Sequence, residues 1–111
     1  MNNSSAGHFV FAVYRPKPGK DDLLLSAVRD HLPILRAEGF VTDRAPVVVR
    51  AADGTLIEMF EWLSNDAIAR AHENPAVRAL WERFDEACEY IRLADLPEAA
   101  LMFPHFEVVA L

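Results

Sequence analysis

The sequence contains little that would serve cross-linking or membrane insertion. Its 111 residues include one cysteine, Cys88, so no disulfide can form within the chain and no oxidising compartment is required. No apolar run approaches the roughly 20 residues of a membrane-spanning helix. The short apolar run at residues 9–14 also lacks the basic segment that precedes a signal-peptide core. These absences argue against disulfide-stapled and membrane-spanning proteins and predict a cytoplasmic location.

Basic side chains are also scarce. Eleven lysines and arginines stand against seventeen aspartates and glutamates, which gives a formal net charge of −6. Binding to nucleic acid or to an anionic membrane surface needs clustered basic groups that neutralise phosphate, so neither partner is expected. The hydrophobic share of 52% and the charged share of 25% are ordinary for one folded domain.

Common signatures of metal and nucleotide sites are missing as well. The chain has no glycine-rich phosphate loop, no nucleophile elbow and no paired cysteines. His72-Glu73 begins like a zinc-protease helix motif, but Ala76 stands where the second histidine ligand would be. We therefore expect no metal and no cofactor. With no repeat and no linker, residues 8–111 are expected to form a single domain after a disordered lead-in at residues 1–7.

Hydrophobic periodicity predicts the element order β-α-β-β-α-β. Strands are expected from β-branched and aromatic content at residues 8–14, 40–51, 55–63 and 106–111. A helix is expected over residues 21–38, and Asp53-Gly54 predicts a tight hairpin in which both residues have positive φ. With right-handed crossovers this order gives an α+β, ferredoxin-like βαββαβ fold, with a four-stranded antiparallel sheet and two helices on one face.

The second helical segment has the clearest apolar stripe. Ser64 is expected as its N-cap, and an interruption is expected at Asn74-Pro75, where asparagine can cap and proline can begin a new helix. Apolar residues then recur at helical spacing at positions 77, 80, 81, 84, 88 and 91. Cys88 is expected in the core, because the acids around it would raise the pKa of its thiol and disfavour a nucleophile.

The first and third predicted strands are apolar on both faces. Phe9, Phe11 and Val13 point to one side of the first strand, while Val10, Ala12 and Tyr14 point to the other. Helices on one side can cover only one of these faces. A second copy, packed sheet against sheet, is the simplest cover for the other, so we expect a homodimer. The alternative is a monomer with scattered exposed apolar residues.

Two strings resemble a known superfamily. They are Phe60-Glu61-Trp62-Leu63-Ser64, and His72-Glu73-Asn74-Pro75-Ala76-Val77 followed by Leu80-Trp81. On these strings residues 8–111 resemble the dimeric α+β barrel superfamily, in the branch of the antibiotic-biosynthesis monooxygenases. That resemblance implies a dimeric barrel and a cofactor-independent monooxygenase acting on a phenolic or quinol-like compound.

The haem-degrading relatives in that superfamily set a limit on the resemblance. They use an asparagine on the first strand and a tryptophan and a histidine on the second helix. The first strand here has no asparagine, and His72 and Trp81 stand in the reverse order, so this triad does not carry over.

Three titratable side chains are candidate bases. His31 shares a helical face with Leu24, Val28 and Leu35, which points it between helix and sheet, either as a pocket residue or as a structural histidine. His72 lies at the helix interruption, where chains of this superfamily rim a pocket; a surface or capping role is its alternative. Glu58 lies among apolar residues of the third strand, as a base under the helices or in an ion pair with Arg36, Arg50 or an arginine of a partner chain.

Aromatic side chains are expected to line the same pocket. They are Tyr14, Phe60, Trp62, Trp81 and Phe84, which at this spacing also suit an ordinary core. We therefore expect a small apolar or aromatic ligand and an enzyme that deprotonates it. The competing hypotheses are a non-catalytic ligand-binding or stress-response dimer and a haem-handling protein.

Overall fold

The computed structural model of the chain describes residues 7–111, so the expected disordered lead-in lies outside the described residues except for Gly7. The elements are β1 (His8–Pro16), α1 (Asp21–Ala37), β2 (Val47–Arg50), β3 (Leu56–Trp62), α2 (Asn65–Ala71), α3 (Pro75–Ala87), β4 (Cys88–Tyr90) and β5 (Glu107–Val108). Two 3-10 turns, Leu93–Asp95 and Pro97–Ala100, lie between β4 and β5. The strands form one sheet in the order β4-β1-β3-β2-β5, and each neighbouring pair is antiparallel.

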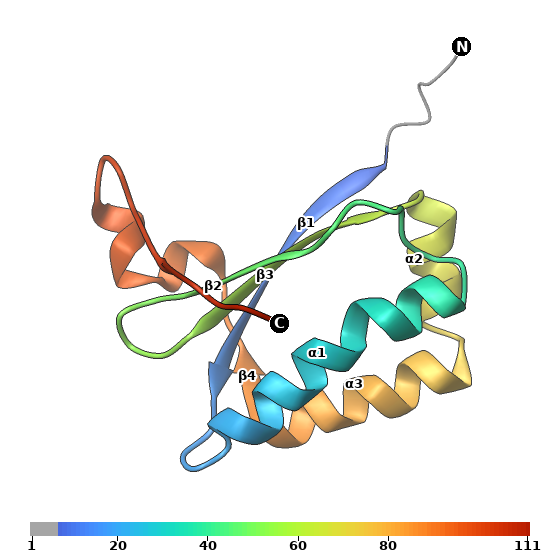
Figure 1. The fold of residues 1–111 in the computed structure, drawn as a ribbon, viewed down its shortest axis with the longest axis horizontal. Coiled ribbons are helices and arrows are strands. Elements are labelled where there is room, and N and C mark those ends of the chain that lie inside the picture. The colour runs from blue at the N-terminus through green and yellow to red at the C-terminus, as the bar shows by residue number, and fades with distance from the viewer. Residues whose placement is uncertain (1–6) are drawn as a thin grey trace.

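The helices lie on one side of this sheet. Figure 1 shows α1 and α3 side by side beneath the strands, while the segment between β4 and β5 lies on the opposite side. The predicted α+β class is confirmed. The sheet of the described residues, however, has five strands where four were expected.

The helix boundaries follow the predicted caps. The Ser64 hydroxyl accepts a hydrogen bond from the backbone N–H of Ala67 at 3.0 Å, and α2 begins at the next residue. The Asn74 side chain accepts from the N–H of Val77 at 3.1 Å, and Pro75 is the first residue of α3. The predicted interruption is confirmed, because each half of the segment has its own N-cap.

The C-terminal end of α3 corrects the sequence prediction. The apolar stripe predicted a helix through Cys88 and Ile91, but the helix ends at Ala87 and Cys88 is extended, with φ −151° and ψ 171°. Residues 88–90 instead pair with β1, where Tyr90 lies opposite Tyr14. Long-range pairing prevails over helical periodicity here. The last predicted strand is reduced to β5, which pairs with β2 at the other edge.

The hairpin between β2 and β3 also differs from the prediction. Among the described residues outside glycine no φ is positive, so Asp53 does not adopt the left-handed conformation that a two-residue turn would demand. The N–H of Ala51 instead donates to the carbonyl of Thr55 at 2.8 Å, which leaves a three-residue loop. Gly54, with φ +92°, supplies the one left-handed residue that such a loop needs.

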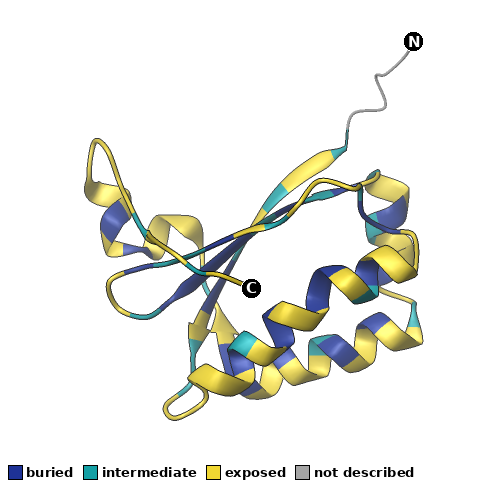
Figure 2. Ribbon diagram, in the orientation of Figure 1, coloured by how far each residue is buried: buried dark blue, intermediate teal, exposed yellow. Residues whose placement is uncertain are grey.

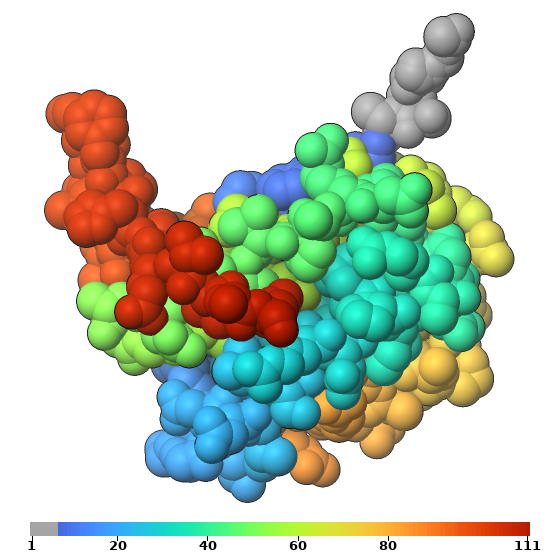
Figure 3. Space-filling view, in the orientation of Figure 1, coloured from blue at the N-terminus to red at the C-terminus, as the bar shows by residue number. Residues whose placement is uncertain are grey.

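The two faces of the sheet have different cover. On the helix side the core includes Leu24 and Leu35 of α1 and Leu80 and Phe84 of α3, all buried. Figure 2 shows this burial along the inner surfaces of the helices and the middle of the sheet. On the other side Val13 and Ile57 pack with Leu96, so the segment after β4 covers part of that face. Figure 3 shows this segment projecting from the body of the molecule.

Candidate functional site

A cavity of about 370 Å³ lies between the helix-covered face of the sheet and the helices. Residues of β1, β3, α1 and α3 make most of its wall, with His72 at the end of α2 and Tyr90 from β4: Val10, Ala12, Tyr14, His31, Phe60, Trp62, His72, Trp81, Phe84, Asp85 and Tyr90. The wall is mostly apolar and aromatic, which is typical of a site for a small organic ligand.

A buried hydrogen-bond network adjoins this cavity. Glu58 is fully buried, and its Oε1 accepts from the Tyr14 hydroxyl at 2.7 Å and lies 2.7 Å from Nδ1 of His31. The strand register explains the contact with Tyr14, because Ala12 lies opposite Glu58 and Tyr14 is two residues further along the same strand. His31 reaches the same carboxylate from α1. The network therefore joins two strands and a helix at one carboxylate oxygen.

The fourth member of the network defines the proton positions. Nε1 of Trp81 donates to Nε2 of His31 at 3.3 Å. An indole nitrogen can only donate, so Nε2 of His31 carries a lone pair and the ring proton is on Nδ1. Nδ1–H then donates to the Glu58 carboxylate. His31 is thus a neutral imidazole oriented by a carboxylate, with its basic nitrogen on the side of Trp81.

Tyr14 serves this network as a neutral donor. Burial raises the pKa of its phenol well above the ordinary value of 10.0, and the nearby charge of Glu58 and their hydrogen bond raise it further. The phenol therefore stays protonated at neutral pH and keeps donating to Glu58. The other carboxylate oxygen, Oε2 of Glu58, is buried and has no hydrogen-bond partner within the described chain.

The structure brings most of the predicted site residues together. Two of the three candidate bases, His31 and Glu58, are in direct contact, and all five predicted aromatic residues line the cavity. The prediction that Arg36 or Arg50 pairs with Glu58 was wrong. Arg50 pairs with Glu107 at 2.7 Å, and Arg36 donates to backbone carbonyls of the loop after α1.

His72 stands apart from the buried network but belongs to the cavity wall. It is exposed at the C-terminal end of α2, where its Nδ1 lies 2.8 Å from the carbonyl oxygen of Ile68. Its ring meets the Trp81 indole edge to face, with 4.9 Å between the ring centres. The structure therefore places His72 at the cavity, as predicted. The alternative capping role is also present, since Nδ1 of His72 lies against a carbonyl oxygen of α2.

Sequence reasoning missed two polar residues of the wall, Asp85 and Tyr90. Asp85 lies one helical turn after Trp81, so its spacing could have indicated the same side of α3. Tyr90 could not be found in this way, because its position follows from the pairing of β4 with β1. Cys88 is in the core as predicted, and burial, followed by the charge of Asp85, raises the pKa of its thiol to about 11.

Residues 7–111 hold neither a group of metal ligands nor a membrane-spanning helix. In that range no group of three or more histidine, cysteine or acidic side chains is placed to hold a metal ion. None of the helices described is long and apolar enough to cross a membrane.

The comparisons with known proteins concern the fold alone. No family model and no curated protein matches the chain. The structure is similar to the crystal structure of NE2512, a protein of unknown function from Nitrosomonas europaea, with a TM-score of 0.58 and 16% sequence identity. The match covers 86% of this chain and 98% of that one, so nearly the whole domain shares the arrangement of elements.

Proposed function

We propose that the protein binds a small, flat, weakly acidic aromatic molecule of the phenol or quinol type, and that His31 removes a proton from it. One observation carries this proposal: a neutral histidine, oriented by a buried carboxylate, presents its basic nitrogen beside an aromatic-lined cavity of about 370 Å³. A general base must be unprotonated, and Nε2 of His31 carries no proton because it accepts from the indole N–H of Trp81, which the substrate must displace.

The buried carboxylate gives the base its strength. When Nε2 accepts the proton, His31 becomes an imidazolium whose Nδ1–H faces Glu58 at 2.7 Å. The resulting ion pair offsets the cost of placing a charge in the protein interior. Tyr14 holds the carboxylate in place through its own hydrogen bond.

The reaction that follows uses dioxygen as the second substrate. Deprotonation leaves an electron-rich anion, and the apolar wall excludes water from it. The keto tautomer of such a phenol has one ring CH₂ group. Dioxygen places one oxygen atom on that carbon, converting it to C=O, and the second oxygen atom leaves as water with the two hydrogens of that group, one of which passes through His31 as a proton. The substrate itself supplies the electrons, so the balance requires no further reductant.

The proposed assembly is a homodimer of ferredoxin-like units. The strands β4, β1, β3 and β2 would form that unit, with β5 added at the edge. Phe9 and Phe11 are each 49% exposed and Val47 is 48% exposed on the side away from the helices, which supports cover by a second copy. Native mass spectrometry tests the proposed dimer, since a protein found only as a monomer does not form the dimeric barrel.

A non-catalytic binding protein is the second candidate. It is favoured by the hydrogen bonds that Tyr14, Glu58, His31 and Trp81 make to one another, which engage their polar atoms except Oε2 of Glu58. In such a protein the network would hold the cavity open and rigid, and no proton would be transferred.

Oxygen uptake with anthrone, a flat acidic ketone with one reactive CH₂ group, separates the two candidates. We expect uptake that depends on the protein and falls at least 100-fold in His31→Gln. Glu58→Gln should lower oxygen uptake as well. Glu61→Gln, on the same strand but outside the cavity, is the matched control and should leave the uptake unchanged. Binding of anthrone without uptake would favour the non-catalytic protein, and absence of binding would refute both.

A further inference from the structure

Three polar side chains of the cavity wall, those of His31, His72 and Asp85, present hydrogen-bond acceptors. Nε2 of His31 carries a lone pair, because the indole of Trp81 donates to it. At His72 the partner of Nδ1 is a carbonyl oxygen, which can only accept, so Nδ1 carries the proton. In the neutral form of this ring, Nε2 of His72 is then an acceptor as well. Asp85 adds a carboxylate to the same wall.

The donors of the wall are few and mostly engaged. The Tyr14 hydroxyl donates to Glu58. Burial raises the pKa of Tyr90, as do the nearby Cys88 and Asp85, so its hydroxyl remains neutral beside an acidic side chain. The indole N–H of Trp81 is directed at the basic nitrogen itself. Arg78 belongs to an adjoining outer hollow and is absent from the wall of the inner cavity.

Trp81 lies between the two acceptor imidazoles. Its N–H contacts His31 on one side, and its ring contacts His72 on the other. It lines the inner cavity and also the outer hollow of about 260 Å³, which Arg78, Glu82 and Asp85 share with it. The bond to His31, at 3.3 Å, is long beside the 2.7 Å bonds of Glu58, and long hydrogen bonds are readily exchanged. The outer hollow therefore leaves room for the indole to move, and the hydrogen bond to His31 that opposes this movement is long.

We propose, building on the ligand site put forward above, that the indole N–H of Trp81 occupies the position at Nε2 of His31 that a ligand hydroxyl takes when the ligand binds. A ligand hydroxyl displaces it and donates to Nε2 of His31, and a second hydroxyl donates to Nε2 of His72. Trp81 and His72 are then specificity-determining residues. The site selects neutral aromatic diols, and it rejects carboxylates, which Asp85 repels, and ligands that only accept hydrogen bonds.

A series of naphthalenes tests this selection on the full chain by isothermal titration calorimetry. The probes are 1,5-dihydroxynaphthalene, 1-naphthol, 1-methoxynaphthalene and 1-naphthoate. Each hydroxyl should lower the Kd by roughly fivefold, as one net hydrogen bond does, and 1-naphthoate should bind most weakly. If none of the four binds, the proposed ligand site itself fails. If all bind equally well, the site stands and the donor selection is refuted.

Two variants locate the selection in named residues. Trp81→Phe removes the competing N–H but retains an aromatic ring, so the preference for 1-naphthol over 1-methoxynaphthalene should increase about fivefold. His72→Phe should abolish the advantage of the diol over 1-naphthol. His105→Phe, the same substitution as at His72 but outside this cavity, should change neither ratio. A ratio of two ligands on one variant cancels a general loss of folding, so unchanged ratios in Trp81→Phe and His72→Phe would overturn the proposal.

Discussion

The two faces of the sheet are built by alternate residues of the same strands, yet they meet different surroundings. On the helix side β1 and β3 present Tyr14, Glu58 and Phe60, which are buried beneath α1 and α3. On the other side the same strands present Phe9 and Phe11, each 49% exposed, with only part of that face covered by the segment after β4. Apolar composition alone therefore does not tell which face holds a site.

The difference lies in where polar groups are placed. The covered face contains a carboxylate bonded to a hydroxyl and an imidazole, whereas the open face is mainly apolar with Glu61 near its end. A buried polar group needs hydrogen-bond partners beside it, and on the covered face Tyr14 and His31 supply those partners to Glu58. An exposed apolar face indicates contact with another surface.

The largest expected effect compares two phenylalanines that face opposite sides. Phe60→Ala should lower the free energy of unfolding by about 3–5 kcal/mol, because it removes a ring that is 2% exposed beneath the helices. Phe11→Ala should cost about 1 kcal/mol or less in the monomer, because that ring is half in solvent. Urea denaturation measures both values.

Protein concentration sharpens this comparison. If a second copy covers the open face, the cost of Phe11→Ala should rise with protein concentration while that of Phe60→Ala stays constant. Equal costs for the two variants at every concentration would contradict the distinction between the faces.

The next effect compares two glutamates on β3. Glu58→Ala should cost about 2–4 kcal/mol, because it leaves the Tyr14 hydroxyl and the Nδ1–H of His31 buried without an acceptor. Glu61 pairs with the exposed side chain of Arg44 at 3.1 Å, so Glu61→Ala should cost under about 1 kcal/mol. Thermal unfolding at pH 7 checks the order, and a larger loss for Glu61→Ala would refute it.

An intermediate effect appears at alkaline pH. Burial raises the pKa of Tyr14 above 10.0 and that of Cys88 from 9.0 to about 11, so both groups ionise more readily in the unfolded chain. Their stabilising contribution is complete below pH 9 and is lost as the pH rises through the folded values. Stability should fall by at most about 1.4 kcal/mol per pH unit for each group.

Variants of these two groups test the source of the alkaline loss. Cys88→Ala should flatten the decline in unfolding free energy between pH 9 and 11, and Tyr14→Phe should flatten it above pH 10. Urea denaturation at intervals of one pH unit measures the slopes. An unchanged slope in both variants would show that other groups cause the decline.

Much of this face could be predicted from residue spacing. A period of two placed Tyr14 and Glu58 on one side of their strands, and helical spacing directed His31 to the sheet. The partner of Glu58 could not be predicted, because it depends on a register that sets Ala12 opposite Glu58. β4 was missed because Cys88 and Ile91 continue the helical period of α3, and only pairing with β1 reveals a strand.

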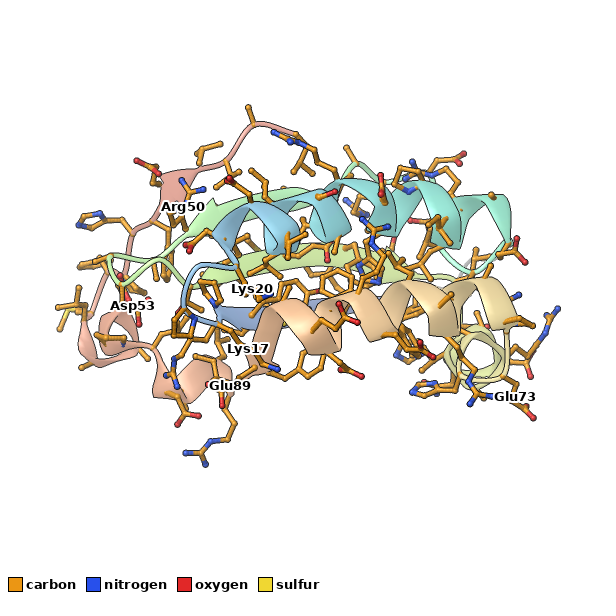
Figure 4. All side chains as sticks on the ribbon, turned by 90° about the horizontal axis from the view of Figure 1, so that it is seen from below. Lys17, Lys20, Arg50, Asp53, Glu73 and Glu89 are labelled. Carbon is orange, nitrogen blue, oxygen red and sulfur yellow. The ribbon has the colours of Figure 1, made fainter. Side chains whose placement is uncertain are left out.

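The smallest expected effect concerns a third carboxylate, at the exposed end of the β2–β3 hairpin. Figure 4 shows Asp53 at the opposite end of the molecule from Glu73, and Asp53 does not line the candidate cavity. Its Oδ1 accepts from the N–H of Thr55 at 3.0 Å, and this backbone bond lowers the pKa of Asp53 from 3.8. The ionised form therefore stabilises the fold above pH 3.8, and that contribution is lost as the pH falls through the lower folded value.

Substitution at Asp53 should thus have a small effect that depends on pH. Asp53→Ala should cost under about 1 kcal/mol at pH 7, the net contribution of one exposed hydrogen bond, and Asp53→Asn should cost less because its amide oxygen still accepts. At pH 2 wild type and Asp53→Asn should unfold at the same urea concentration. A difference that persists at pH 2 would mean that turn geometry, and not the charge of Asp53, determines the stability of this hairpin. At Glu58, by contrast, the carboxylate and its buried hydrogen-bond partners both contribute to stability.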